Sequence, residues 1–179
     1  MPFGSLRGSV VTLRPLRLSD APALDPILRD GRVARFLPPK VRHESGSEFV
    51  KRVLAERARD GGPAFAILPV GSDEVVGHIR FVNWSRPDRK AEVGYWLRRR
   101  FWRRSLGTEA LRLVCRLGFG KMSLRRIEAT VVSGNLGSRR LLEKVGFRLE
   151  GQSRRSVRLS GRWVDAWTFG LLRGELKED

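Results

Sequence analysis

The sequence predicts a mixed α/β (α+β) fold in which about seven strands form one central sheet that is flanked by helices. Segments with alternating apolar and β-branched residues are interspersed with segments whose apolar residues recur at helical spacing. Strands in the first half follow one another as hairpins, whereas a helix separates residues 92–97 from residues 125–132, which implies a parallel crossover. Since no repeat or linker interrupts residues 1–179, we expect a single domain.

Strands are predicted where β-branched and aromatic residues cluster between turn residues. Gly71-Ser72-Asp73 separates two of these segments and is typical of a hairpin turn. The polar tail Arg173–Asp179 is expected to fray. The predicted strands are residues 9–16, 63–70, 74–84, 92–97, 125–132, 147–159 and 163–172.

Helices are predicted from apolar residues at a spacing of three and four. Ser45 or Ser47 can cap the second helix, and Gly120 and Gly146 end the third and the fourth. The apolar segment 33–37 ends at two prolines. The predicted helices are residues 21–29, a segment from Ser45 or Ser47 to about residue 60, and residues 106–119 and 138–145.

The composition limits the possible chemistry. The net charge of +17 predicts attraction to polyanions such as nucleotide phosphates, RNA or an acidic partner, although a GC-rich coding sequence would also favour arginine. Cys115 is the only cysteine and lies on the apolar stripe of a helix, so we expect it in the core. With one cysteine and two distant histidines, we expect neither a metal site nor a histidine-dependent hydrolase. No apolar run reaches membrane-spanning length and no secretory signal is present, so we expect a cytoplasmic protein with no membrane partner.

The basic segment between residues 97 and 106 predicts an anion site. It joins a strand to a helix and contains five arginines within seven residues, 98–104. A helix N-terminus offers free N–H groups and the positive end of the helix dipole, and guanidinium groups add charge there. Phosphate groups are the expected ligand.

Several motifs resemble one known family when they are taken together and in order. They are E-V-G-Y-W-L (92–97), T-E-A-L (108–111), R-R-I-E-A (125–129), N-L-G-S (135–138), L-L-E-K-V-G-F (141–147) and D-A-W-T-F-G-L-L (165–172). This set resembles the GNAT acetyltransferases, most closely the ribosomal-protein N-terminal alanine acetyltransferases of the RimJ/RimL kind. The resemblance implies a mostly antiparallel sheet with a V-shaped split between two central strands, acetyl-CoA as cosubstrate, an amine acceptor and no metal.

The resemblance also implies where acetyl-CoA would bind. The backbone of Trp96 and Leu97 would pair with the pantetheine arm, Asn135 would hydrogen-bond the cosubstrate, and Ser138 would lie near its sulfur. Arg103 and Ser105 occupy positions where the family usually has glycine, so a Cβ atom at Ser105 could narrow the cradle. The residues that would surround the pyrophosphate are Trp102, Arg103, Arg104, Ser105, Leu106, Gly107 and Thr108.

For catalysis, acetyl transfer needs a base for the amine and an acid for the leaving thiolate. Glu92 and Glu128 are the candidate bases, with a slight preference for Glu92; either could instead be solvated or paired with an arginine. Ser138 is the candidate acid, or alternatively a plain N-cap. Tyr95 should point to the opposite face of its strand from Glu92.

Two functions remain open from the sequence alone. The first is N-acetylation of a protein or peptide N-terminal amine, or of a small amine such as an aminoglycoside-like compound. The second is a degenerate member of the fold that binds RNA or protein through its basic surface. Ribosome or RNA proximity and a homodimer through an uncovered edge strand are the expected further partners.

Overall fold

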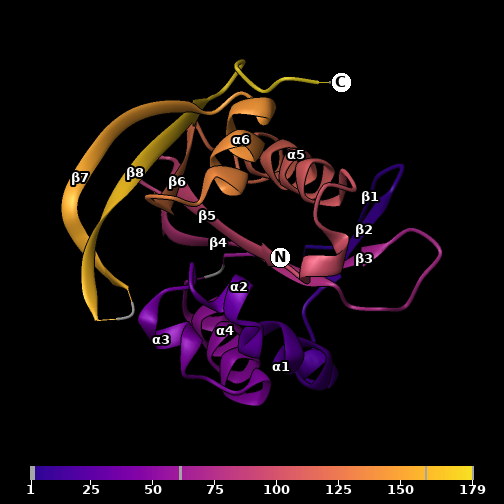
Figure 1. Cartoon of the computed structure of the whole chain (residues 1–179). Helices are drawn as coiled ribbons and strands as arrows, with labels where there is room; N and C mark the ends of the chain where they lie inside the picture. The colour runs from indigo at the N-terminus through magenta and orange to yellow at the C-terminus, as the bar shows by residue number, and fades with distance from the viewer. Residues whose placement is uncertain (1–2, 61, 160, 179) are drawn as a thin grey trace.

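The structure, a computed structural model, describes residues 3–60, 62–159 and 161–178. Its centre is an eight-stranded mixed sheet with the order β1-β2-β3-β4-β5-β6-β8-β7, and helices cover both faces (Figure 1). All neighbouring strands are antiparallel except β5 and β6, which are parallel. The predicted mixed, mostly antiparallel fold is therefore confirmed.

The strands follow the predicted segments closely. The expected seven are present, and a two-residue strand at the N-terminal edge makes the eighth. The strands are β1 (Leu6–Arg7), β2 (Val11–Pro15), β3 (Ala64–Pro69), β4 (Gly77–Ser85), β5 (Lys90–Leu97), β6 (Arg126–Val132), β7 (Arg148–Leu159) and β8 (Arg162–Leu172).

Four of the helices match the predicted ones, and two short helices were not predicted. Ser45 forms a capping box with Glu48, since Glu48 N donates to Ser45 Oγ (3.2 Å) and Ser45 N donates to Glu48 Oε2 (2.8 Å). Residues 33–37, read from the sequence only as an apolar segment, partly belong to a helix capped by Asp30. The α-helices are α1 (Ala21–Arg29), α2 (Gly31–Ala34), α3 (Pro39–Arg42), α4 (Gly46–Asp60), α5 (Leu106–Phe119) and α6 (Leu136–Val145), and residues 18–20 and 99–101 form short 3-10 helices.

The sheet separates two hydrophobic cores. One core packs α5 and α6 against one face, and the other packs α1 and α4 against the opposite face (Figure 1). Alternate residues of β5 enter different cores: Val93 and Leu97 face α5, whereas Trp96 faces α4. Cys115 is fully buried in the first core, as predicted.

The two central strands diverge after a short parallel contact. Their register joins Lys90 with Arg126, Ala91 with Ile127 and Glu92 with Glu128. Beyond these pairs, residues 93–97 pair with β4, and residues 129–132 pair with β8. The sheet therefore splits in a V whose vertex lies at Glu92 and Glu128, which confirms the predicted split.

The tail does not fray over the residues that the structure describes, in contrast to the prediction. Leu176 packs against the α5/α6 core, and Lys177 N donates to Val145 O (2.9 Å). Lys177 O accepts from Arg112 Nε (2.9 Å). This apolar contact, these backbone bonds and the ion pairs of Glu175 with Arg148 and of Glu178 with Arg116 dock a segment that looks polar in composition. Asp179 lies outside the described residues. Within them, no helix is both long and apolar enough to span a bilayer.

Candidate active site

The two candidate bases lie at the vertex of the V with different partners. Both project from the face that carries α1–α4, because Ile127 and Val93 next to them enter the other core. Glu128 accepts from Arg126 Nε (2.8 Å), and Arg126 also pairs with Glu150. The half-buried Glu92 instead accepts from Asn83 Nδ2 at 3.0 Å, so its partner is neutral. Of the two glutamates, Glu128 is therefore the one that is paired with an arginine, as the alternative interpretation foresaw. Glu92 keeps a carboxylate oxygen available for a proton.

A bulge in β4 positions the partner of Glu92. The register of β4 against β5 shifts between Val82 and Ser85, and Asn83 in this bulge has a left-handed φ of 52°. Asparagine tolerates this conformation better than most residues with a side chain. Asn83 was not predicted as a site residue; the available signal was an asparagine next to Trp84 near the end of a predicted strand.

On the opposite face of β5, two hydroxyl groups meet inside the V. Tyr95 OH and Ser138 Oγ lie 2.8 Å apart, although 43 residues separate them in sequence. Burial raises the pKa of Tyr95 above its ordinary value, and the hydrogen bond with Ser138 offsets this only in part. Tyr95 therefore stays protonated at neutral pH and can serve as a proton donor. The predicted face of Tyr95 is confirmed, but its contact with Ser138 was not foreseen.

Asn135, not Ser138, is the N-cap residue of α6. Its Oδ1 accepts from Ser138 N at 3.2 Å. Ser138 lies in the first turn of the helix, and this position frees its hydroxyl for Tyr95. The cap interpretation of Ser138 is therefore wrong.

The backbone of β5 has a free edge on the side where β6 diverges. Arg98 N donates to Val76 O (2.7 Å), so even-numbered residues of this segment, including Trp96, direct their backbone groups toward β4. Tyr95 and Leu97 consequently direct theirs into the V, so Leu97 is placed as predicted for the pantetheine arm, but Tyr95 takes the place predicted for Trp96. Leu97 O accepts from Trp102 Nε1 (2.9 Å), which places the indole at the mouth of the V. An extended amide-containing ligand can pair with such an edge.

The loop before α5 adopts two left-handed conformations. Arg103 has a φ of 60° and Ser105 a φ of 61°, and these are the two positions where the resembled family has glycine. Ser105 is the N-cap residue of α5, yet its side chain makes no capping hydrogen bond. At Gly107, a Cβ atom would lie 2.9 Å from Leu141 Cδ1, so glycine permits the close contact of α5 with α6.

Part of the positive charge of this loop is neutralised. Arg98 and Arg100 both pair with Glu74, the first at 2.6 Å. Arg104 lies over the Phe101 ring at 5.7 Å. Among the described residues no carboxylate pairs with Arg99, Arg103 or Arg104. These three guanidinium groups lie close in sequence to the N-terminus of α5 and supply the charge of the predicted anion site.

Glu109 in the first turn of α5 anchors the start of β2. Its carboxylate accepts from the backbone N–H groups of Ser9 (2.7 Å), Val10 (2.8 Å) and Val11 (2.9 Å), and from Ser9 Oγ. Partial burial raises the pKa of Glu109, but these hydrogen bonds outweigh it and hold the pKa below its usual value. Glu109 therefore positions the helix whose N-terminus carries the anion site.

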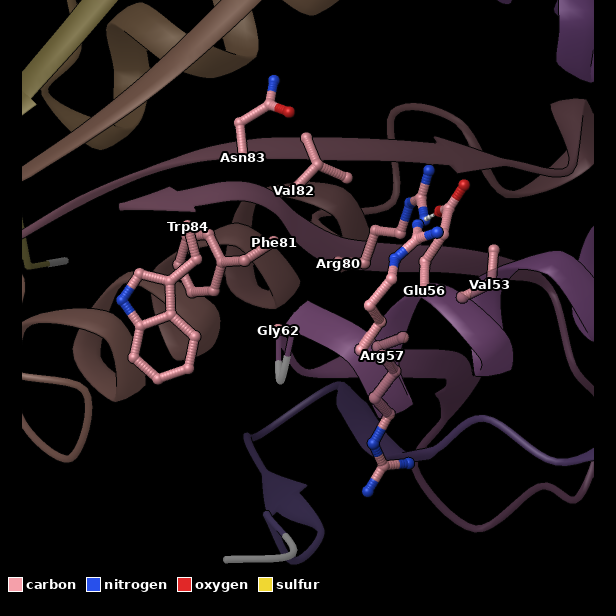
Figure 2. Close-up of a pocket in the computed structure, with 11 residues that line it drawn as sticks. Val53, Glu56, Arg57, Gly62, Arg80, Phe81, Val82, Asn83 and Trp84 are labelled. Carbon is pink, nitrogen blue, oxygen red and sulfur yellow. Dashed lines mark hydrogen bonds and ion pairs between the residues drawn. The ribbon is translucent and has the colours of Figure 1, made fainter. Parts of the chain in front are cut away.

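A pocket of about 370 Å³ lies beside α4, at the end of β4 that carries Asn83, the hydrogen-bond partner of Glu92. Its lining comes from α4, β4 and the start of β3; Figure 2 shows Asn83 and Trp84 leaving β4 in opposite directions and Glu56 beside Arg80. Asn83 both lines this pocket and donates to Glu92. Asn83 therefore links the pocket to the candidate base.

His78 is buried away from this chemistry. It packs between Phe49 and Trp96, and its Nδ1 donates to Phe65 O (3.1 Å). Burial, with a smaller contribution from the charge of Arg80, lowers the pKa of His78 to about 3, so the ring is neutral. No cluster of potential metal ligands occurs in the described part of the chain.

Comparisons with known proteins agree with this geometry. The family model described as an acetyltransferase (GNAT) domain matches residues 11–148. The probable N-acetyltransferase YjcK of Bacillus subtilis is 30% identical, with 93% of this chain and 96% of YjcK covered. YdaF of the same organism, named as a proposed ribosomal N-acetyltransferase, is 27% identical, with 92% of each chain covered. The structure of Mycobacterium smegmatis RimJ in complex with CoA-disulfide superposes with a TM-score of 0.84 at 32% identity and covers 98% of this chain and 89% of that one.

Proposed function

Because the chain belongs to the GNAT acetyltransferase family and is thus an acyltransferase, we propose that it transfers the acetyl group of acetyl-CoA to the N-terminal amine of a protein or peptide. The observation that carries this proposal is the V between β5 and β6, which has Glu92 on one face and the Tyr95–Ser138 pair on the other. The relatives named for ribosomal proteins and RimJ support a ribosomal-protein acceptor.

The residues present fit acetyl-CoA as cosubstrate. The backbone of Tyr95 and the N–H group of Leu97, on the free edge of β5, would pair with the pantetheine amides, whereas Leu97 O is engaged by Trp102 Nε1. Arg103, Arg104 and the N-terminus of α5 would hold the pyrophosphate through charge-assisted hydrogen bonds. Asn135, at the N-terminus of α6, lies beside Ser138 and would contact the cosubstrate near its sulfur.

The side chains can supply both proton transfers. An N-terminal amine has a pKa of about 7.7–8.0, so Glu92 can take its proton directly or through one water. The nitrogen lone pair then forms the C–N bond, the nitrogen releases its second proton to solvent, and the C–S bond breaks as the tetrahedral intermediate collapses to the amide. Sulfur leaves with the bonding electrons and takes a proton from the Tyr95–Ser138 pair, which solvent reprotonates. A backbone N–H of the free β5 edge would stabilise the negative oxygen.

The test compares two carboxylates at the same vertex. Glu92→Gln should lower kcat at least tenfold and leave acetyl-CoA binding intact, whereas Glu128→Gln should have a smaller effect because Arg126 already engages that carboxylate. CoA release reports turnover, and thermal unfolding with acetyl-CoA reports binding; a cosubstrate at 100 times its Kd adds about 2.7 kcal/mol. No thermal shift at millimolar acetyl-CoA would refute the proposal.

The hairpin of β7 and β8 favours a second function, polyanion binding. Arg158 lies opposite Trp163 across the hairpin, and the Trp163 side chain is 61% exposed. Asp165 accepts from Arg155 N (2.8 Å) and Gln152 Nε2 (2.6 Å). Exposed arginines beside an exposed indole suit single-stranded RNA, which would bring the enzyme close to a ribosome. The hairpin arginines that make no ion-pair contact with a carboxylate among the described residues are Arg154, Arg155, Arg158 and Arg162.

Salt titration of RNA binding tests this second function. Replacing the four hairpin arginines with glutamine should reduce the slope of log K against log salt by about 2.8, since each phosphate contact of a single strand contributes about 0.7. The matched control replaces four exposed lysines with glutamine, Lys40, Lys51, Lys121 and Lys144. Equal slopes in both variants would exclude a specific role for the hairpin. β7 is the last strand of the sheet, and its outer edge has no strand partner among the described residues. We propose that this edge supports a homodimer, and sedimentation of the wild-type chain tests this.

A further inference from the structure

The pocket that Asn83 links to Glu92 carries uncompensated positive charge. Its carboxylate, Glu56, is shared by Arg80 (2.5 Å) and Arg52 (3.1 Å), and Arg52 is also bound to Glu44 (2.5 Å). This chain of two carboxylates and two guanidinium groups is neutral as a whole. Glu56 therefore leaves no negative charge for a cationic ligand.

Arg57 is a cationic side chain of the pocket that takes no part in this ion-pair network. It is half-buried, lines the pocket, and forms no ion pair with any carboxylate among the described residues. On the far wall, Arg86 lies over the Trp84 ring at 4.6 Å and adds positive potential at the rim. A half-buried guanidinium facing a polar pocket is suited to a carboxylate, which it can bind with two parallel hydrogen bonds.

The opposite end of the pocket is suited to an amine. Asn83 donates its amide hydrogen to Glu92, so its Oδ1 remains available as an acceptor, and Glu92 keeps a second oxygen. The pocket volume of about 370 Å³ lies in the range of small-ligand sites and can hold about two residues of a peptide. One end thus favours an amino group and the other an anion.

We propose that the acceptor is a peptide N-terminus with an acidic side chain within its first three residues, whose carboxylate binds Arg57 while its amine reaches Glu92. This inference rests on the proposed function of the same site. It also agrees with the net charge of +17, which attracts an acidic segment and repels a polycationic one.

The experiment compares three N-terminal peptides that differ only at positions two and three. Wild-type protein should acetylate Ser-Glu-Glu peptides with a kcat/KM at least tenfold above that for Ser-Gln-Gln, with Ser-Lys-Lys lowest. Arg57→Gln should lower kcat/KM for the acidic peptide about ten- to hundredfold, mainly through KM, and leave the neutral peptide unchanged. Arg57→Glu should reverse the order of the acidic and basic peptides.

Controls separate this inference from the function on which it rests. Lys51→Gln removes one positive charge from an exposed position of α4 outside the pocket. This variant should leave the ratios of kcat/KM among the three peptides unchanged. Free glutamate as acceptor distinguishes an acidic amino acid from an acidic peptide; its acetylation in preference to the peptide would overturn the peptide assignment. Acetylation of all three peptides at equal rates would refute the role of Arg57 but keep the proposed function. An Arg57→Gln variant that loses activity equally on every peptide would also overturn the inference. No acetylation of any amine would refute the function itself.

Discussion

Replacing Ser105 with glycine tests whether the loop before α5 is strained at the cosubstrate site. Ser105 has a φ of 61°, which costs a residue with a side chain about 1–2 kcal/mol, and its hydroxyl makes no capping bond that would be lost. Glycine adds about 0.5–1 kcal/mol of chain entropy to the unfolded state. The net gain should be about 0.5–1 kcal/mol, or a Tm rise of about 1–4 °C. Without its Cβ atom the loop should also bind acetyl-CoA about two- to fivefold more tightly, or about 0.4–1 kcal/mol.

Ser123 provides a matched control for this change. It is an exposed serine with a φ of 53°, and it lies in the turn after α5, outside the proposed cosubstrate site. Ser123→Gly should raise the Tm by a similar amount without changing the acetyl-CoA Kd. Differential scanning calorimetry and isothermal titration measure the two quantities. A lower Tm for Ser105→Gly, or the same change of Kd in both variants, would refute the reasoning.

Three further predictions follow from side chains described above. Tyr95→Phe and Ser138→Ala should each lower kcat with little change in acetyl-CoA affinity, and the double variant should be no slower than the worse single one, as steady-state kinetics would reveal. His78 binds a proton more readily in the unfolded chain, since its pKa is about 3 in the folded protein and about 6.5 in the unfolded chain. The free energy of unfolding should therefore fall by about 1.4 kcal/mol per pH unit from pH 6 to pH 4. Urea titrations at several pH values should show a weaker dependence of stability on pH for His78→Phe. Glu109→Gln should lower the free energy of unfolding by about 2–3 kcal/mol at pH 7, whereas Glu143→Gln, which removes a surface ion pair, should lower it by less than about 0.5 kcal/mol. Because the folded pKa of Glu109 is depressed, the stability that this carboxylate contributes should be lost as the pH falls through that pKa. An equal loss of stability at pH 7 and pH 3 would contradict this prediction.

Long periodic segments were predictable from the sequence because each one has enough residues to show its period. The bounds of α1 and α5 agree with the predicted ones, and the crossover from β5 through α5 to β6 followed from the helix between two strands. The short elements were missed: two residues of β1 and four each of α2 and α3 contain too few residues for a recognisable period.

The site was predictable only in part, because its contacts join distant segments. Strand alternation correctly placed Tyr95 opposite Glu92, but nothing local could show that α6 would bring Ser138 to its hydroxyl group. The same holds for Asn83 with Glu92, which depends on a bulge, and for Glu109 with the start of β2, which lies about 100 residues away. Composition also gave the wrong expectation for the tail, which Leu176, backbone hydrogen bonds and ion pairs hold against the rest of the chain.

The divergence of β5 and β6 places an edge strand in the middle of the sheet. The two halves of the sheet share a seam of only three residue pairs, and past it the amides of Tyr95 and Leu97 have no strand partner on that side among the described residues. In amide hydrogen exchange these interior positions should behave like a peripheral strand, with low protection beside well-protected neighbours in β4. An extended ligand bound in the V would supply the backbone hydrogen bonds that β5 lacks there, and it would thereby connect the two halves into one continuous sheet.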